Sequence, residues 1–532
     1  ALRLNAMYNE ADNNGAGSSI DKKGIAGAYR FGIGEKNEFL LGLYHLDNNN
    51  GMNYGMPWIR PNASSPVSDT TLLPLDPKAY YGMASDYNAG QATYATLGHI
   101  HRFDADNEIK TMVRKGDYKR DQRAGTVRVA GAAQQPDGKA VYLDNFGPMT
   151  RLTRGTQLKI QDMQNLYAQS DYSGKFEAWG VKHAVLAGVD YAQEKRQVYS
   201  ALTAAQGGVN LTKPNTSVGT PNDGAWIDEG SRVLRGGNEY VSKGWGVYGQ
   251  DLVQVAPDWK ILGGLRYDSM TGDYDTFNAA TGAVTGSYRM KVSEWSKRFG
   301  VLYQPSPLHS FHFSYGTSFN TSGEAYSLGA ANVNTPPESS ENLELGARIE
   351  SADKKFTSRV ALFKSTKKHE RNTDPLLPGI TVLSGKRHVA GIDADIAGYI
   401  TPQWEVFGSY MWMPTAKIDI GAQGAEGQGA RPSLTPKHSG TVWSTYRITP
   451  QIRVGAGLNF RSSQTPIRNP GWSVPSYVTG DLMAEYAIDV DRIILKANIS
   501  NVSNKLYADA LYSGHYSPGA GRLFQVSAKF KF

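Results

Sequence analysis

The last residues of the chain alternate strictly between apolar and polar side chains. The apolar positions are Phe524, Val526, Ala528, Phe530 and Phe532. The polar positions between them are Gln525, Ser527, Lys529 and Lys531. Because successive side chains of a β-strand point to opposite faces, this segment predicts a strand with one apolar face and one wet, charged face.

The same alternation recurs in segments 259–268, 343–350, 452–461 and 493–500. Arg or Lys facing lipid at the bilayer midplane costs about 2–4 kcal/mol, so the polar sets must face a lumen. The alternative, a large soluble protein with half-buried strands, is disfavoured by this regular recurrence. The sequence therefore predicts an all-β fold, a transmembrane antiparallel β-barrel of the bacterial cell outer membrane. In its last strand we expect Phe524, Val526, Phe530 and Phe532 to face lipid, and Lys529 and Lys531 to face the lumen.

Bulk composition agrees with a barrel. The 532 residues are too many for one ordinary hydrophobic core. Mean hydropathy is −0.45, and no run of about 18 apolar residues predicts a transmembrane helix. Cysteine is absent, which excludes disulfides, thiol catalysis and cysteine–zinc sites. No signal peptide stands at Ala1, so we expect this numbering to begin on a processed or truncated chain.

Short polar turns alternate with long irregular segments along the chain. The short turns fall at 34–37, 104–107, near Gly180, and at 256–258, 306–308, 352–354, 401–403, 449–451 and 489–491. The long segments are 48–90, 120–151, 200–238, 319–341, 368–380, 419–437, 462–475 and 505–521. In bacterial barrels short turns face the periplasm and long loops face outside, and we expect about 20 strands here.

Several motifs carry a family likeness. The carboxy-terminal ones are NISNVSNKLY at 498–507 and YSPGAGR at 516–522, and two more segments are 303–316 and 337–346. With these motifs the chain resembles, over essentially its whole length, the barrel of TonB-dependent ferric-siderophore receptors. The loop motifs YGMPW at 54–58, LDPK at 75–78 and YYG at 80–82 are similar to the second outer loop of the branch that takes up catecholate-type iron chelates.

The resemblance implies more than the barrel. Members of the family have about 22 strands and carry a plug domain that engages TonB. We therefore expect residues 1–532 to be the barrel domain, with the plug and the first two strands absent from this sequence. The implied function is TonB-dependent uptake of a ferric siderophore when the plug is present. The alternatives are a passive porin-like channel, or a receptor for a hydroxamate siderophore, haem or a vitamin.

The expected partners follow from this function. They are a ferric siderophore, TonB through the missing plug, outer-membrane lipid and lipopolysaccharide; the receptor is expected to be a monomer without a cofactor. Nucleic acid is disfavoured because basic residues are interleaved with acidic ones along the strands. No motif predicts an enzyme, and we interpret His99 and His101, beside Asp104, as a lumen-facing pair and not a metal site.

Basic and aromatic loop residues are the candidate ligand contacts. The net charge is +7, and cationic walls concentrate anionic ligands such as ferric tris-catecholates. Arg side chains and aromatic faces can stack on planar catechol rings. The candidates are Tyr54, Trp58, Arg60, Tyr80, Tyr81, Tyr118, Arg120, Arg123, Trp226, Tyr326 and Tyr516, and the last loop also carries Tyr512 and His515. We expect Arg120 and Arg123 to stand just past a strand end. These residue types also have alternative roles. Basic residues of the outer loops can contact lipopolysaccharide phosphates, and tyrosines can form the aromatic girdle at the membrane interface.

Overall fold

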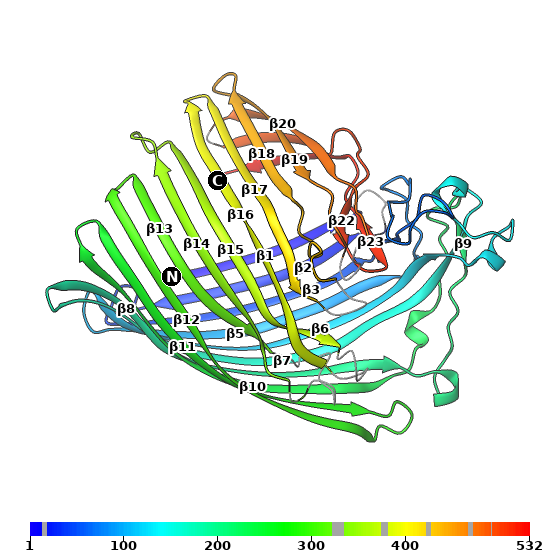
Figure 1. Ribbon diagram of the computed structural model, residues 1–532, viewed down its shortest axis with the longest axis horizontal. Coiled ribbons are helices and arrows are strands. Elements are labelled where there is room, and N and C mark those ends of the chain that lie inside the picture. The colour runs from blue at the N-terminus through cyan, green and yellow to red at the C-terminus, as the bar shows by residue number, and fades with distance from the viewer. Residues whose placement is uncertain are drawn as a thin grey trace.

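The computed structural model folds the chain into one large antiparallel sheet that curves around a lumen (Figure 1). The structure describes residues 1–12, 17, 19–321, 333, 335–373, 381–421, 427–466, 472–490 and 492–531. Within these ranges the sheet has 21 strands, of which β9 is only two residues long. The predicted all-β antiparallel barrel of about 20 strands is confirmed.

The long strands follow one another around the sheet in chain order. The first ten are β1 (Leu2–Ala11), β2 (Ile20–Phe31), β3 (Asn37–Gly51), β5 (Tyr87–Arg102), β6 (Asn107–Val129), β7 (Arg151–Ala178), β8 (Val181–Ala201), β10 (Leu234–Ala256), β11 (Trp259–Phe277) and β12 (Val284–Ser306). The others are β13 (His309–Asn320), β14 (Glu338–Glu350), β15 (Phe356–Thr373), β16 (Thr381–Thr401), β17 (Trp404–Ile420), β18 (His438–Arg447), β19 (Ile452–Arg461), β20 (Tyr477–Asp489), β21 (Ile493–Ser500) and β24 (Leu523–Phe530).

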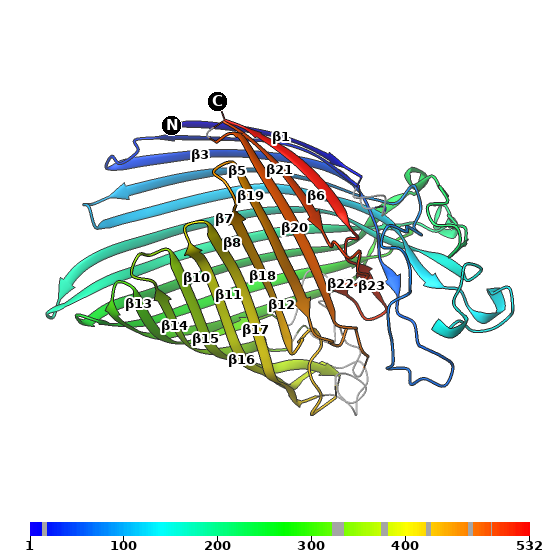
Figure 2. The same ribbon diagram turned by 90° about the horizontal axis from the view of Figure 1, so that it is seen from above.

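Each long strand pairs with its neighbours in the chain, so the sheet is a simple meander. Every predicted short turn joins two strands, for example β2 to β3 and β10 to β11. All these turns lie at one end of the barrel, and the long connections lie at the other, which we call the outer end. Among the described residues β1 pairs with β2 and β24 pairs with β21. These two strands are the edges of the sheet, and both run along the top in Figure 2.

The outward face of the barrel is apolar. Opposite residues of an antiparallel pair share a face, and the register places one row of large side chains across five strands. That row is Leu2, Tyr29, Leu41, Leu97 and Val113. These side chains are all at least one-third exposed, as lipid-facing side chains must be when no lipid is present. The opposite face carries buried or paired charges, such as Arg266, whose guanidinium lies 2.6 Å from Asp190.

The last strand has the predicted arrangement. Phe530, Val526 and Phe524 of β24 lie opposite Ile493, Ala497 and Ile499 of β21, so apolar side chains face the same way on both strands. Lys529 alternates with them and points to the other face. Phe532 lies outside the described residues.

The histidine pair near the first turns points the other way from the prediction. His99 lies opposite Phe39, and their rings stack with centroids 4.6 Å apart. Phe39 shares its face with the outward Leu41, two residues along the strand. His99 and His101 both hydrogen-bond the Asn37 side chain, at 3.0 and 2.8 Å. They therefore belong to an outward aromatic girdle at the short-turn end, and the prediction that they face the lumen is wrong.

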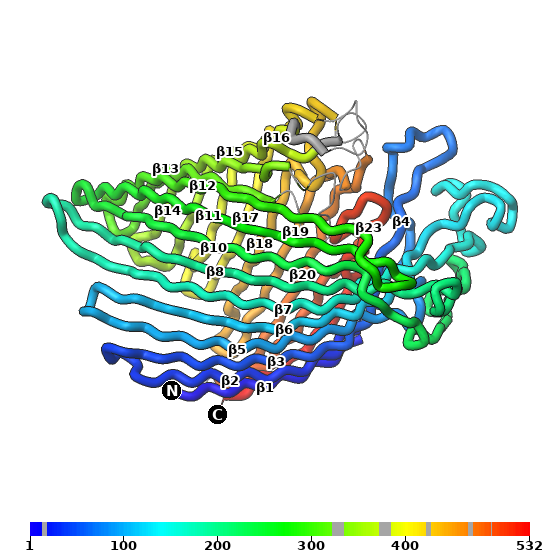
Figure 3. The backbone as a smooth tube through the Cα atoms, turned by 90° about the horizontal axis from the view of Figure 1, so that it is seen from below, coloured from blue at the N-terminus to red at the C-terminus, as the bar shows by residue number. Residues whose placement is uncertain are grey.

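The outer end is covered by folded loops, visible at the right of Figures 1 and 3. Their short elements are β4 (Met56–Pro57), β9 (Thr216–Ser217), β22 (Ala508–Leu511), β23 (His515–Pro518) and the 3-10 helices η2 (Ala132–Gln134), η3 (Leu143–Asn145), η4 (Ala204–Gln206) and η5 (Glu229–Ser231). None of the helices in the described ranges has the length and apolarity needed to cross a membrane. The loops enclose a hydrophobic core of their own. This loop core comprises Met56, Trp58, Ile59, Leu72, Leu73, Tyr81, Val127, Leu152, Val474, Ala508, Leu511 and Tyr516.

Candidate functional site

A small second sheet ties two distant loops together at the outer end. In it β4, from the loop after β3, pairs with β23, from the last loop, and β23 pairs with β22. Gly55 precedes β4 with φ +89°, and a Cβ there would lie 2.2 Å from the Tyr516 carbonyl oxygen. Only glycine fits such a left-handed, closely packed position. The Trp58 indole N–H donates to the Tyr512 carbonyl at 2.9 Å, which fixes the tip of the last loop.

This second sheet holds a stack of three rings. The His515 ring lies between those of Tyr54 and Tyr512, with centroids 5.2 and 4.5 Å away. The interplanar angles are 22° and 13°, so the rings are close to parallel. Offset parallel stacking is a favourable arrangement of aromatic rings. The outer Tyr512 ring is 44% exposed, which leaves room for a further planar group.

Cations surround the stack. Lys159 Nζ lies 5.6 Å from the centre of the Tyr54 ring, within the range of a cation–π contact. Burial, together with the charges of Arg128 and Lys159, lowers the pKa of His515 to about 4. Burial raises the pKa of Tyr54, while Arg128 and Arg120 act in the opposite direction. The charges of Arg120, Arg128 and Lys159 therefore act on the Tyr54 and His515 rings.

The strands β6 and β7 present these cations on the inward face. Arg120 is opposite Gln161, and Lys159 is opposite Gln122. Arg120 donates to the Asn88 side chain at 3.3 Å, and Arg128 donates to the Val127 carbonyl at 2.7 Å. In the described part of the chain no carboxylate pairs with any of the three cations. We call Tyr54, Tyr512, His515, Arg120, Arg128 and Lys159 the mouth cluster.

The structure corrects the expected setting of two arginines. Arg120 and Arg123 lie inside β6, because the strand continues to Val129, and not beyond a strand end. Arg123 points to the opposite face from Arg120. Its side chain is 9% exposed and pairs with Asp121 at 2.8 Å.

Three of the sequence candidates are structural members of the loop core. Trp58, Tyr81 and Tyr516 are 8%, 3% and 1% exposed. The Tyr516 hydroxyl accepts a hydrogen bond from the Leu73 amide at 3.0 Å, and the Tyr81 hydroxyl donates to the Val218 carbonyl at 2.9 Å. These side chains hold the loops in place and have little surface free for a ligand.

The other candidates are dispersed. Arg60 donates to the Tyr142 hydroxyl at 3.1 Å and stacks over its ring, whereas the Tyr80 hydroxyl donates to the Met83 carbonyl at 3.0 Å. Trp226 is 63% exposed on the loop before β10, and Tyr118 lies two residues from Arg120 on the same inward face of β6. Tyr326 lies outside the described residues. Arg128 and Lys159 were not among the candidates, although the alternation of β6 and β7 would have placed them beside Arg120.

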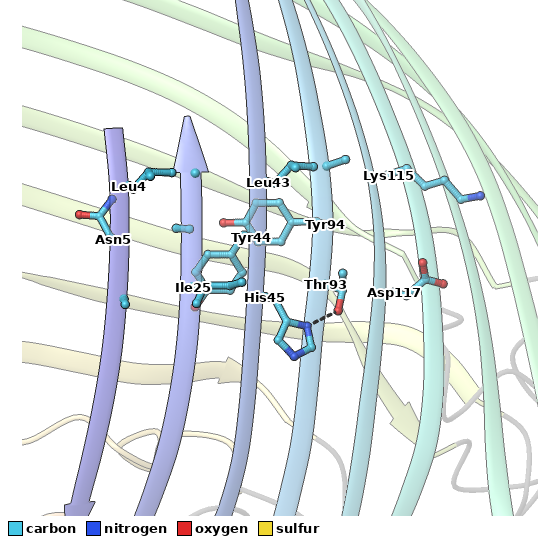
Figure 4. A pocket seen from close by; sticks show the side chains of 14 residues that line it. Leu4, Asn5, Ile25, Leu43, Tyr44, His45, Thr93, Tyr94, Lys115 and Asp117 are labelled. Atoms are coloured by element: carbon cyan, nitrogen blue, oxygen red, sulfur yellow. Dashed lines mark hydrogen bonds between the residues drawn. The ribbon is translucent and has the colours of Figure 1, made fainter. Parts of the chain in front are cut away.

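Several hollows lie along the barrel wall, and two of them bear on where a ligand could bind. The larger, about 930 Å³, spans β1, β2, β3, β5 and β6, and Figure 4 shows its side chains, including the His45–Thr93 hydrogen bond of 2.8 Å. Most of its lining, such as Leu4 and Leu43, belongs to the outward apolar face, so it is not a site for a water-soluble ligand. The second, about 520 Å³, is polar and inward, and is lined by residues that include Arg461, Tyr477 and Tyr507. The Tyr477 and Tyr507 rings lie 4.5 Å apart.

No metal centre is evident. Within the described ranges, no group of three or more His, Cys, Asp and Glu side chains is arranged to hold a metal ion. The mouth cluster offers aromatic faces and cations, which are suited to a planar anion.

Comparison with known proteins identifies the fold family. The family profile described as TonB dependent receptor-like, beta-barrel, matches residues 29–502. The catecholate siderophore receptor Fiu of Escherichia coli (strain K12) is 25% identical over 573 residues, covering 100% of this chain and 72% of Fiu. The probable TonB-dependent receptor BfrD of Bordetella pertussis is 24% identical, covering 100% of this chain and 73% of BfrD.

Solved structures agree in fold. The closed form of the Escherichia coli ferric-catecholate import receptor Fiu superposes with a TM-score of 0.87 at 22% identity, covering 100% of this chain and 77% of that one. The siderophore receptor PiuA of Acinetobacter baumannii gives a TM-score of 0.85 at 21% identity, covering 99% and 76%. The chain therefore belongs to the TonB-dependent receptor family, as an outer-membrane β-barrel of that family.

Proposed function

We propose that this receptor takes up a ferric siderophore of the catecholate type, by TonB-dependent active transport. Membership of a family of transporters excludes an enzyme. The observation that carries the ligand assignment is the mouth cluster, in which three stacked rings are flanked by three cations that have no carboxylate partner among the described residues. The relatives whose names include catecholate import, at 22–25% identity, support the same assignment.

The chemistry of the cluster fits this ligand class. A ferric tris-catecholate is a compact anion with flat aromatic faces and phenolate oxygens. Its rings can stack on an exposed tyrosine, and Arg and Lys side chains can donate to its oxygens and neutralise its charge. Ferric hydroxamates are mostly neutral and lack aromatic rings, so they would use neither feature.

Among the candidates we assign different roles. We propose Tyr54, Tyr118 and Arg120 as ligand contacts, together with Arg128, Lys159, Tyr512 and His515. Trp58, Tyr81 and Tyr516 support the loops that carry those contacts. Arg60, Tyr80, Arg123, Trp226 and Tyr326 stay predictions, without a contact assigned.

Binding to the intact receptor tests the proposal. We expect the ferric complex of 2,3-dihydroxybenzoate to bind the wild type, and Tyr54→Ala or Lys159→Gln to weaken binding roughly tenfold, as for a central contact. The matched control is Lys195→Gln, because Lys195 points outward from β8 and pairs with Glu239 at 3.1 Å. It should change affinity by less than about twofold, since a rim charge contributes little. Binding of a ferric hydroxamate but not of the catecholate, or unchanged affinity in both site variants, would reject the assignment.

A separate growth experiment tests whether uptake of the ferric siderophore depends on TonB. Cells that produce the full-length receptor under iron limitation should grow on the ferric catecholate only when TonB is present. Growth without TonB would favour the alternative of a passive channel.

A further inference from the structure

The outward wall carries a pair of lysines near the outer end of the barrel. Lys243 of β10 and Lys291 of β12 both lie opposite Thr271 of the intervening β11. All three side chains therefore share the outward face. The two lysine backbones are two strand spacings apart, about 10 Å, and both side chains are exposed.

These two lysines differ from the other cations around them. One strand over, Lys195 pairs with Glu239 at 3.1 Å. Two residues further along β12, Arg289 lies 3.5 Å from Asp273. Among the described residues neither Lys243 nor Lys291 has such a carboxylate partner, so this patch of the wall carries two uncompensated positive charges.

An aromatic run marks the membrane boundary directly below the pair. Trp245, Tyr267 and Trp295 lie on the same outward face of β10, β11 and β12, with centroids 5.6 and 5.1 Å apart. Trp245 and Trp295 are 48% and 58% exposed. Tyrosine and tryptophan concentrate at the headgroup level of membranes. Because Lys243 and Lys291 lie towards the outer end from this run, they stand at the height of the outer-leaflet headgroups.

We propose that Lys243 and Lys291, with the aromatic run below them, form a binding site for the phosphorylated glucosamine headgroup of lipopolysaccharide. The two ammonium groups would each meet a phosphate. Trp245 and Trp295 would contact the sugar and the first methylenes of the acyl chains. Such a site would require only the outward face of an outer-membrane barrel, whichever ligand the receptor takes up.

The site makes a specific prediction about lipid retention. Intact receptor purified in mild detergent and given bis-phosphorylated lipid A should retain it, as measured by native mass spectrometry. Because Lys243→Gln/Lys291→Gln removes both ammonium groups that would meet the phosphates, it should weaken retention by at least about tenfold. The matched control is Lys110→Gln/Lys175→Gln, which removes two cations from the opposite face near the short turns and should retain lipid A like the wild type.

Two further measurements test whether the phosphates and the aromatic run both contribute to lipid retention. Lipid A stripped of its phosphates should bind the wild type no better than it binds the double variant. A tryptophan variant, Trp295→Ala, should also lose retention although both lysines remain. The proposal is overturned if Lys243→Gln/Lys291→Gln keeps wild-type retention, or if inorganic pyrophosphate protects the wild type against heat as well as lipid A does.

Discussion

His515 shows how burial sets the chemistry of a single residue at the mouth. Its ring lies between two tyrosines and close to two cations. Burial and those charges disfavour the imidazolium and lower the pKa of His515 to about 4. The ring is therefore neutral near pH 7, where it acts as a stacking partner and adds no charge to the mouth.

This pKa predicts a pH dependence for the second sheet. When the last loop opens, His515 regains its usual pKa near 6.5, so the opened form binds more protons between about pH 6.5 and pH 4. The stability of the closed loop is then fully present above pH 6.5 and is lost as pH falls towards 4. We expect the protection factor of segment 508–518, which is the intrinsic amide exchange rate at each pH divided by the measured rate, to be several-fold lower at about pH 4.5 than at about pH 7.5.

The variant His515→Phe keeps a planar ring and removes the titration. The protection factor of segment 508–518 in this variant should be nearly independent of pH, whereas His45→Gln, a change on the outward wall, should behave like the wild type. Equal pH dependence in wild type and His515→Phe would show that another group controls the loop.

Only part of the candidate site could be predicted from the sequence. Composition and loop position pointed to Tyr54 and Arg120, because aromatic and basic residues cluster around them. Burial could not be read in the same way, so Trp58 and Tyr516 were given as candidate contacts, whereas both pack in the loop core. Arg128 was missed although it falls in the segment expected to be a loop, and Lys159 was missed because it lies in a strand, whereas the candidates were drawn from loops.

At the scale of elements, an ionic cluster fastens the long loops to one another. Lys213 lies 2.8 Å from Asp86 and 3.2 Å from Glu229, and its side chain is fully buried. Asp86 also accepts hydrogen bonds from the Met83 and Gly125 amides. Burial would raise the pKa of Glu229, but a hydrogen bond from Arg232 and the charge of Lys213 outweigh it and lower that pKa. The cluster therefore joins three segments through charges that are paired and out of water.

Removing one partner should release the loop before β10. Lys213→Met leaves two buried carboxylates with one cation fewer, which typically costs about 3–5 kcal/mol. We expect faster deuterium exchange across segment 202–233 and earlier cleavage there by proteases. The control is Lys182→Met, whose pair with Glu177 is 71% and 72% exposed at 3.8 Å and is worth at most about 1 kcal/mol. If both variants protect the segment equally, the cluster does not fasten the loop.

The elements themselves were the most predictable feature. Each short turn was marked by local polar residues or proline, such as Pro257-Asp258 and Ser306-Pro307, and all of the turns join strands in the structure. The outer end of β6 was predicted less well, because this strand continues to Val129 with polar side chains on both faces. There the alternation that reveals a lipid-facing strand no longer exists. Pairing between distant loops, such as β4 with β23, leaves no local pattern in the sequence.

At the scale of the whole molecule, the two faces of the wall separate two kinds of recognition. The outward face is apolar and carries its uncompensated lysines above an aromatic run. The inward face carries the cations of the mouth cluster. The two lysines and the mouth cluster therefore lie on opposite faces of the wall, and each can be altered without the other.

This separation predicts how salt acts on ligand capture. Uncompensated cations at a cleft accelerate the arrival of anions, and salt screens the effect beyond about 10 Å at 0.1 M. Between about 0.05 and 0.5 M salt, we expect the association rate of an anionic ferric catecholate to fall roughly tenfold, with little change in its dissociation rate.

Two double variants test whether the mouth cluster causes this effect. In Arg128→Gln/Lys159→Gln the association rate at low salt should be lower than in the wild type, and it should depend less on salt. In Lys243→Gln/Lys291→Gln the association rate at low salt and its salt dependence should both match the wild type, because those lysines point away from the lumen. Stopped-flow measurements on the intact wild type and on both double variants give these association rates. Equal salt dependence in the two double variants would mean that net charge, and not the mouth cluster, accelerates ligand binding.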